Sequence, residues 1–283
     1  QTAISLYIIY SIRPLSSLCL LCGVIHRHEV VRFFLFDAHN PEEKAKILVA
    51  AMAIAAPVFP LTMAAHALGL VAAVMVLVWC IAFRGGFALA SSNKNLIFNL
   101  HPFLMLVGFV IMGGEAVMSY RSLPFSKYTR KLIHMLLHGI ALVLGILGIC
   151  AAFKFHNESS IPNMYSLHSW IGIVVISLYG IQWIYGLVVF LVPGRSPALR
   201  RAALPWHVLF GMMIYFLAVA NCLLGFLEKL TFLENSGVYK YGSEAFLVNF
   251  TGLVTVLFGV SVALSLSSQV SDSSSVDDGY SPL

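Results

Sequence analysis

The chain has 283 residues, of which 59% are hydrophobic and only 10% are charged. Soluble domains carry about 25% charged residues, so this composition excludes an ordinary soluble enzyme and predicts a protein that crosses the membrane several times. The formal net charge of +5 does not indicate a nucleic-acid partner, because the basic residues lie in short segments beside apolar runs, where the membrane surface explains them.

Six apolar runs are long enough to cross a hydrocarbon core of about 30 Å, which takes about 20 helical residues. The runs are continuous rather than alternating, so they predict helices and not the strands of a β-barrel. The predicted fold class is therefore all-α, with a six-helix transmembrane domain over residues 52–267. The predicted spans are residues 61–83, 97–120, 132–153, 167–192, 207–227 and 246–267.

The two ends of the chain differ from this domain in composition. Residues 1–51 combine a short apolar stretch with the polar segment DAHNPEEKAK, and we expect an N-terminal extension outside the six-helix core. Residues 268–283 are rich in Ser and Asp, which predicts a disordered tail.

The orientation of the protein is predicted from the basic residues of its short connecting segments. The segments after the second and fourth spans contain seven Lys and Arg residues, whereas those after the first, third and fifth spans contain five. Because Lys and Arg are retained on the cytosolic side, this bias predicts that both termini, including the tail, lie in the cytosol.

Four of the ten histidines stand out, because each lies in the first turn or two of a different predicted helix, from the second to the fifth. Successive helices cross in opposite directions, so the first and third of these histidines are predicted near the outer face, and the second and fourth near the cytosolic face. At about 1.5 Å per residue in a core of about 30 Å, the two levels should lie on the order of 15 to 20 Å apart. The four are His101, His134, His168 and His207, separated by 33, 34 and 39 residues.

Two imidazoles facing each other across a helix bundle suit axial ligation of haem iron, and an ionisable residue inside a membrane is itself an indication of function. The alternative is that all four are helix-end histidines satisfied by carbonyls or water. Zinc fits less well, because each level offers two imidazoles, whereas zinc usually takes three or four protein ligands. Glycines on the same helices either leave room for a flat macrocycle or allow close helix packing. We therefore expect helices two to five to form a central four-helix bundle that holds two haems.

The segments around these histidines resemble a known family. NLHPFLMLVGF, KLIHMLLHGIAL, YSLHSWIG and LPWHVLFG are similar to motifs of the cytochrome b561 family, the ascorbate-dependent transmembrane oxidoreductases with two haems, and the likeness covers about residues 62–265. NKNLIFNLHP, FHNES and LEKLTFLEN look most like the plant vacuolar-membrane members, so we expect a vacuolar or other endomembrane location. The resemblance implies two haem b cofactors, one bound by His101 and His168 and the other by His134 and His207, and it is compatible with a homodimer.

The resemblance also implies a substrate site at each face. The positions that contact cytosolic ascorbate in the family are here Lys127, Lys131 and Arg200. The alternative for these basic residues is retention on the cytosolic side without substrate contact.

At the outer face, three residues match the family's second substrate site, where monodehydroascorbate or a ferric chelate accepts the electron. They are Phe155, His156 and Tyr165. A surface His and Tyr also occur as anchors at the membrane interface, so this alternative stays open.

Other polar residues of the spans receive simpler interpretations. His138, one turn after a predicted ligand, is expected to pack on haem or to hydrogen-bond beside it. His66 is expected to be an interfacial residue, while Glu115, Glu228 and Lys229 are expected to reach the membrane surface by snorkelling.

Membrane proteins of two other classes also carry histidines in their helices. A ferric reductase or NADPH oxidase carries two haem ligands on each of two helices and a soluble flavin domain, and this sequence has neither. A haem-free metal-ion transporter that uses the same histidines remains the alternative.

Overall fold

The computed structural model describes residues 58–268. The predicted extension, the first residues of the predicted domain and nearly all of the predicted tail lie outside the described residues. Within the described range, all regular elements are helices, and six are long and apolar enough to cross a membrane, which confirms the all-α class. These spans are Leu61–Phe83, Asn95–Tyr120, Lys127–Glu158, Leu167–Leu191, Pro197–Asn235 and Ser243–Leu266.

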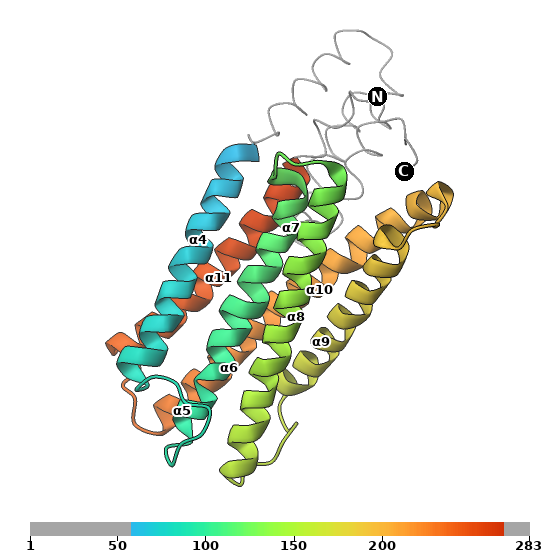
Figure 1. Cartoon of the computed structure of the whole chain (residues 1–283). Helices are drawn as coiled ribbons and strands as arrows, with labels where there is room; N and C mark the ends of the chain where they lie inside the picture. Colours follow the sequence, from blue (N-terminus) through green and yellow to red (C-terminus); the bar gives the residue numbers. More distant parts are fainter. Residues whose placement is uncertain (1–57, 269–283) are drawn as a thin grey trace, which may run out of the picture. The chain divides into compact units, whose positions relative to one another are not determined.

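Some spans are continuous helices, and others join α-helical and π-helical pieces. Figure 1 labels the α-helices in chain order. The second span is the most divided, since a π-helical stretch connects its two halves. In chain order the elements are α4 (Val58–Val78), η2 (Trp79–Phe83), α5 (Asn95–Phe98), α6 (Leu100–Phe103), η3 (Leu104–Ile111), α7 (Met112–Ser122), α8 (Lys127–Glu158), α9 (Leu167–Gly186), η4 (Leu187–Leu191), α10 (Pro197–Asn235) and α11 (Ser243–Ser268).

Spans two to five form the predicted four-helix bundle. Helix α8 packs against α7 on one side and α9 on the other, α10 packs against α9, and η3 closes the ring by contacting α10. Helices α4 and α11 run side by side and contact the bundle through α7 and α10 (Figure 1). The four histidines predicted above therefore belong to the bundle, and the first and last spans pack against it.

Small side chains allow α4 and α11 to pack closely along a seam, and a pair of hydroxyls joins the two helices at one end. Phe258 is fully buried there, and a Cβ atom at Gly69 would lie 3.1 Å from its ring. Such small residues allow transmembrane helices to approach closely. At one end of the seam, the hydroxyls of Thr62 and Ser265 lie 2.8 Å apart.

Serine residues cap the N-termini of α8, α9 and α10. Ser126 accepts a hydrogen bond from the backbone N–H of Thr129, at 3.2 Å, and thereby caps α8. Ser166 and Ser169 form a capping box at the start of α9, and Ser196 caps α10 in the same manner. These caps satisfy N–H groups that lack helical partners. They begin α8 and α10 well before the apolar runs predicted at residues 132 and 207.

The two ends of the bundle are named here after the orientation predicted from the sequence. The predicted cytosolic end carries the connections after α7 and η4. The predicted outer end carries the connections after η2, α8 and α10.

Candidate functional site

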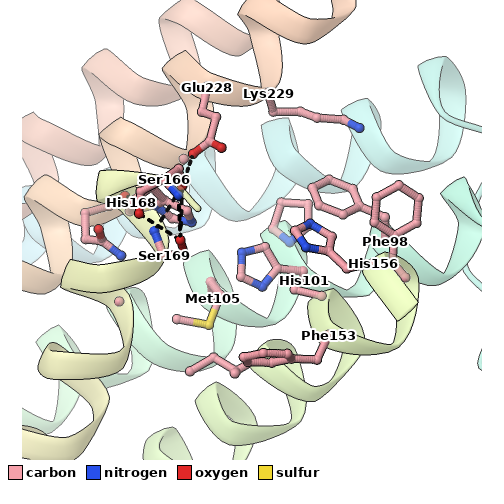
Figure 2. Close-up of a pocket in the computed structure, with 18 of the residues that line it drawn as sticks. Phe98, His101, Met105, Phe153, His156, Ser166, His168, Ser169, Glu228 and Lys229 are labelled. Carbon is pink, nitrogen blue, oxygen red and sulfur yellow. Dashed lines mark hydrogen bonds between the residues drawn. The ribbon is translucent and has the colours of Figure 1, made fainter. Parts of the chain in front are cut away.

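The first histidine pair lies at the predicted outer end and consists of one residue from α6 and one from α9. The rings of His101 and His168 have centres 6.0 Å apart and planes at 84°. Each Nδ1 donates to a backbone carbonyl at 3.0 Å, that of Gly148 for His101 and that of Asn221 for His168. Both rings line a cavity of about 390 Å³ (Figure 2).

The second pair lies at the predicted cytosolic end, between α8 and α10. The ring centres of His134 and His207 are 6.4 Å apart. The Nδ1 of His134 donates to the carbonyl of Ala116 at 2.8 Å. The Nδ1 of His207 lies instead 3.0 Å from Nε2 of Gln182, which also donates to the His207 carbonyl at 2.7 Å. This pair lines a second cavity, of about 260 Å³.

The geometry of both pairs fits a haem. A bond of about 2 Å between a metal and each imidazole nitrogen places the centres of two axial imidazoles about 6 Å apart, close to the separations found. A carbonyl at Nδ1 fixes the tautomer and leaves Nε2 as the metal ligand. Within residues 58–268, no group of three or more His, Cys, Asp or Glu side chains could hold a metal ion. Each level offers two facing imidazoles, which fits haem, a group that carries further ligands to its own iron.

Glycines leave space beside two of these rings. A Cβ atom at Gly225 would lie 2.7 Å from Cε1 of His168, and one at Gly186 would lie 3.0 Å from Cε1 of His207. By contrast, a Cβ atom at Gly108 would meet Leu144 of the neighbouring helix at 2.7 Å. Close packing therefore accounts for Gly108, and Gly186 and Gly225 admit the rings of His207 and His168, whereas room for a macrocycle stays a prediction.

The neighbour of the cytosolic pair has a polar partner, as the sequence suggested. His138 stands one turn beyond His134, with ring centres 4.4 Å apart. Its Nδ1 forms a hydrogen bond with the hydroxyl of Tyr179. His138 lines the same cavity from the same helix as His134, so it cannot face His134 across a flat group.

The predicted ascorbate residues gather at the cytosolic end. Lys131 lines the second cavity, and its Nζ donates to the carbonyl of Phe190 at 3.5 Å. Lys127 and Arg200 lie within electrostatic range of Lys131. Lys127 is exposed at the start of α8, and Arg200 donates from Nη2 to a carbonyl beyond η4 at 3.2 Å. The structure therefore brings three cations to one rim.

The predicted outer substrate residues form a continuous set of rings. The centres of Phe155 and His156 are 5.7 Å apart, and His156 stacks on Tyr165 at 6.1 Å. All three line the outer cavity. Partial burial, and then the carboxylate of Glu228, hold the pKa of the Tyr165 phenol above its ordinary value, because both disfavour the phenolate.

His66 and Lys229 have partners that the sequence did not indicate. Nδ1 of His66 on α4 lies 2.8 Å from a carboxylate oxygen of Glu115 on α7, so these residues pair with each other across helices. Nζ of Lys229 lies 4.1 Å from the centre of the Phe98 ring, and the side chain lines the outer cavity, so Lys229 has an aromatic partner whether or not it also reaches the membrane surface.

Gln182 and Lys229 are the site residues that the sequence interpretation missed. A signal for Gln182 was present, since it is a single amide within a long apolar run, YGIQWIYG, where a polar group needs a partner. Lys229 gave no comparable signal, because a lysine near a helix end is ordinary at a membrane surface.

The fold and the two cavities define a class of protein: a six-span membrane protein with a facing histidine pair near each end of a four-helix bundle. The sequence profile of eukaryotic cytochrome b561 matches residues 100–233, which include all four histidines. Together with the relatives below, this match shows that the chain belongs to the cytochrome b561 family, whose cofactor is haem b.

Similar proteins occur in plants and animals. The chain is 60% identical to transmembrane ascorbate ferrireductase 1 of Arabidopsis thaliana over 239 residues, which are 82% of this chain and 100% of the relative. It is 67% identical to ascorbate-specific transmembrane electron transporter 1 of Zea mays over 207 residues, 73% of this chain and 88% of the relative. A transmembrane ascorbate-dependent reductase of Sus scrofa is 41% identical over 196 residues, 69% of this chain and 77% of the relative.

Proposed function

We propose that this protein is a transmembrane oxidoreductase that carries electrons from cytosolic ascorbate, through two haem b groups, to an acceptor at the outer face. The acceptor is monodehydroascorbate or a ferric chelate, and the membrane is that of the vacuole or another internal compartment. The observation that carries the proposal is the facing imidazole pair near each end of one bundle, with ring centres 6.0 and 6.4 Å apart. Relatives named for ascorbate-dependent reduction and electron transport support it.

In this proposal each histidine pair holds one haem. His101 and His168 would bind the outer group, and His134 and His207 the cytosolic one. The carbonyl partners at Nδ1 of His101, His134 and His168 orient these rings and leave Nε2 for the iron, and Gln182 positions the ring of His207. Haem b supplies reversible one-electron chemistry when bound, while the protein sets its position and surroundings.

The cytosolic cations bind the electron donor. Ascorbate is an anion, so the rim formed by Lys127, Lys131 and Arg200 attracts it toward the second cavity. Lys131 is placed to contact the bound anion, because it lines that cavity. The guanidinium of Arg200 provides a planar set of donors that suits paired oxygen atoms.

At the outer face, Phe155, His156 and Tyr165 form the wall against which the acceptor binds. Their rings line the same cavity as His101.

An absorption spectrum of the purified protein tests this proposal. We expect the bands of a low-spin b-type cytochrome with two haems per chain, and ascorbate alone should reduce them. A haem-free metal-ion transporter would show no such bands, and that result would contradict the proposal.

Replacing a cytosolic ligand gives a sharper test of the assignment. We predict that His134→Ala or His207→Ala removes about half of the haem, since one haem needs both of its axial ligands, and abolishes reduction by ascorbate. Haem is measured per chain as the pyridine complex, and reduction by stopped-flow absorbance. Two variants that retained the full haem content and the full reduction rate would show that the cytosolic assignment is wrong.

A further inference from the structure

Two adjacent charged residues of α10, Glu228 and Lys229, reach the outer cavity and diverge there (Figure 2). A carboxylate oxygen of Glu228 accepts a hydrogen bond from the hydroxyl of Ser166 at 3.0 Å. The ammonium of Lys229 extends the other way and lies 4.1 Å from the centre of the Phe98 ring and 5.8 Å from that of Phe155. The cavity is thus acidic near the start of α9 and basic near the start of the second span.

Among the residues that the structure describes, the ammonium of Lys229 forms no salt bridge: Glu244 lies within electrostatic range, but its carboxylate is paired with Arg84. The contacts of the ammonium with these residues are with the faces of aromatic rings, which attract a cation but accept no conventional hydrogen bond. Other cations at this end are paired: Arg84 with Glu244, and Lys94 with Glu158 at 2.7 Å. A half-buried cation that lies over aromatic rings in a cavity and forms no salt bridge retains the capacity to bind an anion.

The position of Lys229 connects the two parts of the outer site. The Phe98 ring beneath its ammonium has its centre 5.9 Å from that of His101 and 5.0 Å from that of Phe155. Phe155 in turn contacts the ring of His156. An anion bound to Lys229 therefore lies beside rings that lead directly to the outer histidine pair.

We propose that Lys229 is the anion-binding residue of the outer cavity and that its ligand is a carboxylate or a similar anionic oxygen group. The group belongs either to the electron acceptor, such as a ferric carboxylate chelate, or to the haem held by His101 and His168. Glu228 repels the same group from the side of Ser166 and so fixes its orientation. This inference rests on the proposed function and names the residue that selects the ligand's charge at the outer site.

The competing explanation is that Lys229 only packs its methylene stem on Phe98. Three variants separate the two roles. Lys229→Met keeps an unbranched apolar stem and removes the charge, whereas Lys229→Arg keeps the charge. Lys240→Met is the matched control, because Lys240 is exposed in the connection after α10 at the same end of the bundle and its loss changes the net charge equally.

The experiment uses the intact haem-loaded protein in sealed vesicles with ascorbate inside. Initial rates are measured with two acceptors outside, anionic ferric citrate and cationic hexaammineruthenium(III). The inhibition constant of gallium citrate, a redox-inert analogue of the ferric chelate, is measured against ferric citrate. Haem content and the midpoint potentials of the haems are determined separately by redox titration, and thermal unfolding confirms that each variant is folded.

If the acceptor supplies the anion, Lys229→Met raises the KM for ferric citrate and the inhibition constant of gallium citrate about tenfold, the loss expected for one hydrogen bond to a charged group. The KM for the ruthenium cation and the midpoint potentials stay unchanged. If the haem supplies the anion, one midpoint potential falls and both acceptors are affected alike. In either case Lys229→Arg restores the wild-type behaviour and Lys240→Met has no effect.

The inference is overturned if Lys229→Met matches the wild type and Lys240→Met in the KM values, the inhibition constants and both potentials. Failure of the proposed function has a different signature, since the wild-type protein would then lack haem bands or reduction by ascorbate. Equilibrium binding of gallium citrate to the wild type and to Lys229→Met would still test the anion site in that case.

Discussion

Hydrogen bonds to Nδ1 distinguish one imidazole of the bundle from the other three. His101, His134 and His168 each donate to a backbone carbonyl, a partner that the helical backbone provides whatever side chain stands at that position. His207 has the side chain of Gln182 instead. The orientation of the His207 ring therefore depends on the Gln182 side chain, which a mutation can remove.

We predict that Gln182→Leu weakens haem binding at the cytosolic site about tenfold, the lower end of the range for loss of a side chain that orients a metal ligand. Leucine has a similar volume but offers no hydrogen bond to Nδ1 or to the carbonyl of His207. The measurement is haem retention by the purified protein during titration with apomyoglobin, followed separately for the two haems.

Ser177→Ala is the control for this variant, because Ser177 lies on the same helix and its hydroxyl only donates to the carbonyl of Ile173. The positioning role also predicts a change in the electron paramagnetic resonance signal of the cytosolic haem alone. Equal retention and an unaltered signal in Gln182→Leu would show that His207 does not depend on this amide.

At this scale the sequence predicts the pairing of the histidines better than it predicts their surroundings. Alternation of helix direction is enough to group His101 with His168, and the structure brings the same rings together. The direction of Lys229 could not be predicted in this way. It depends on the cavity that Phe98 and Phe155 form after α5, α8 and α10 have packed.

Helix ends show a similar limit at the scale of the element. The apolar cores of all six spans follow from composition, because about 20 apolar residues are needed to cross the bilayer. A helix can extend beyond the bilayer as far as its N-terminal cap. Helix α8 therefore starts at Lys127, after Ser126, and α10 starts at Pro197, after Ser196. The serine caps were visible in the sequence, but a window that measures hydropathy does not detect them.

Helix α10 approaches the ring of His168 on α9 closely at Gly225. Gly225 of this helix faces α9, where an added Cβ atom would lie 2.7 Å from Cε1 and 3.2 Å from Nδ1 of His168. We predict that Gly225→Ala displaces this ring and reduces the haem content to about half, because the ligand geometry of one haem is lost. Haem per chain is measured as the pyridine complex.

Gly252→Ala on α11 is the matched control, since an added Cβ atom there would make only an ordinary contact of 3.5 Å with Leu223. In a helix interior the same substitution usually stabilises by about 1 kcal/mol. A loss of haem from Gly225→Ala without a loss of folding is therefore diagnostic of steric contact with His168. Full haem content in Gly225→Ala would contradict the close approach.

At the scale of the whole molecule, the two cavities lie at opposite ends of one bundle and differ in charge. The cytosolic cavity has Lys131 on its wall, with Lys127 and Arg200 nearby. The outer cavity has one acidic and one basic residue on its wall, Glu228 and Lys229. Since an anionic donor is attracted by the more basic rim, the charge distribution supports the direction of electron entry in the proposed function.

This direction can be measured together with the topology of the chain. Ser196 precedes α10 at the predicted cytosolic end, and Ser236 follows it at the predicted outer end, and both are exposed. In sealed vesicles, a membrane-impermeant maleimide should label Ser196→Cys and Ser236→Cys from opposite sides. Ascorbate should reduce the protein only from the side on which Ser196→Cys is labelled, because the Lys131 rim lies at that end. The unmodified protein corrects for the native cysteines, of which Cys80, Cys150 and Cys222 lie within spans.

Two outcomes would contradict this prediction. Reduction from the Ser236→Cys side would reverse the assignment of donor and acceptor cavities. Labelling of both positions from one side would show that α10 does not cross the membrane.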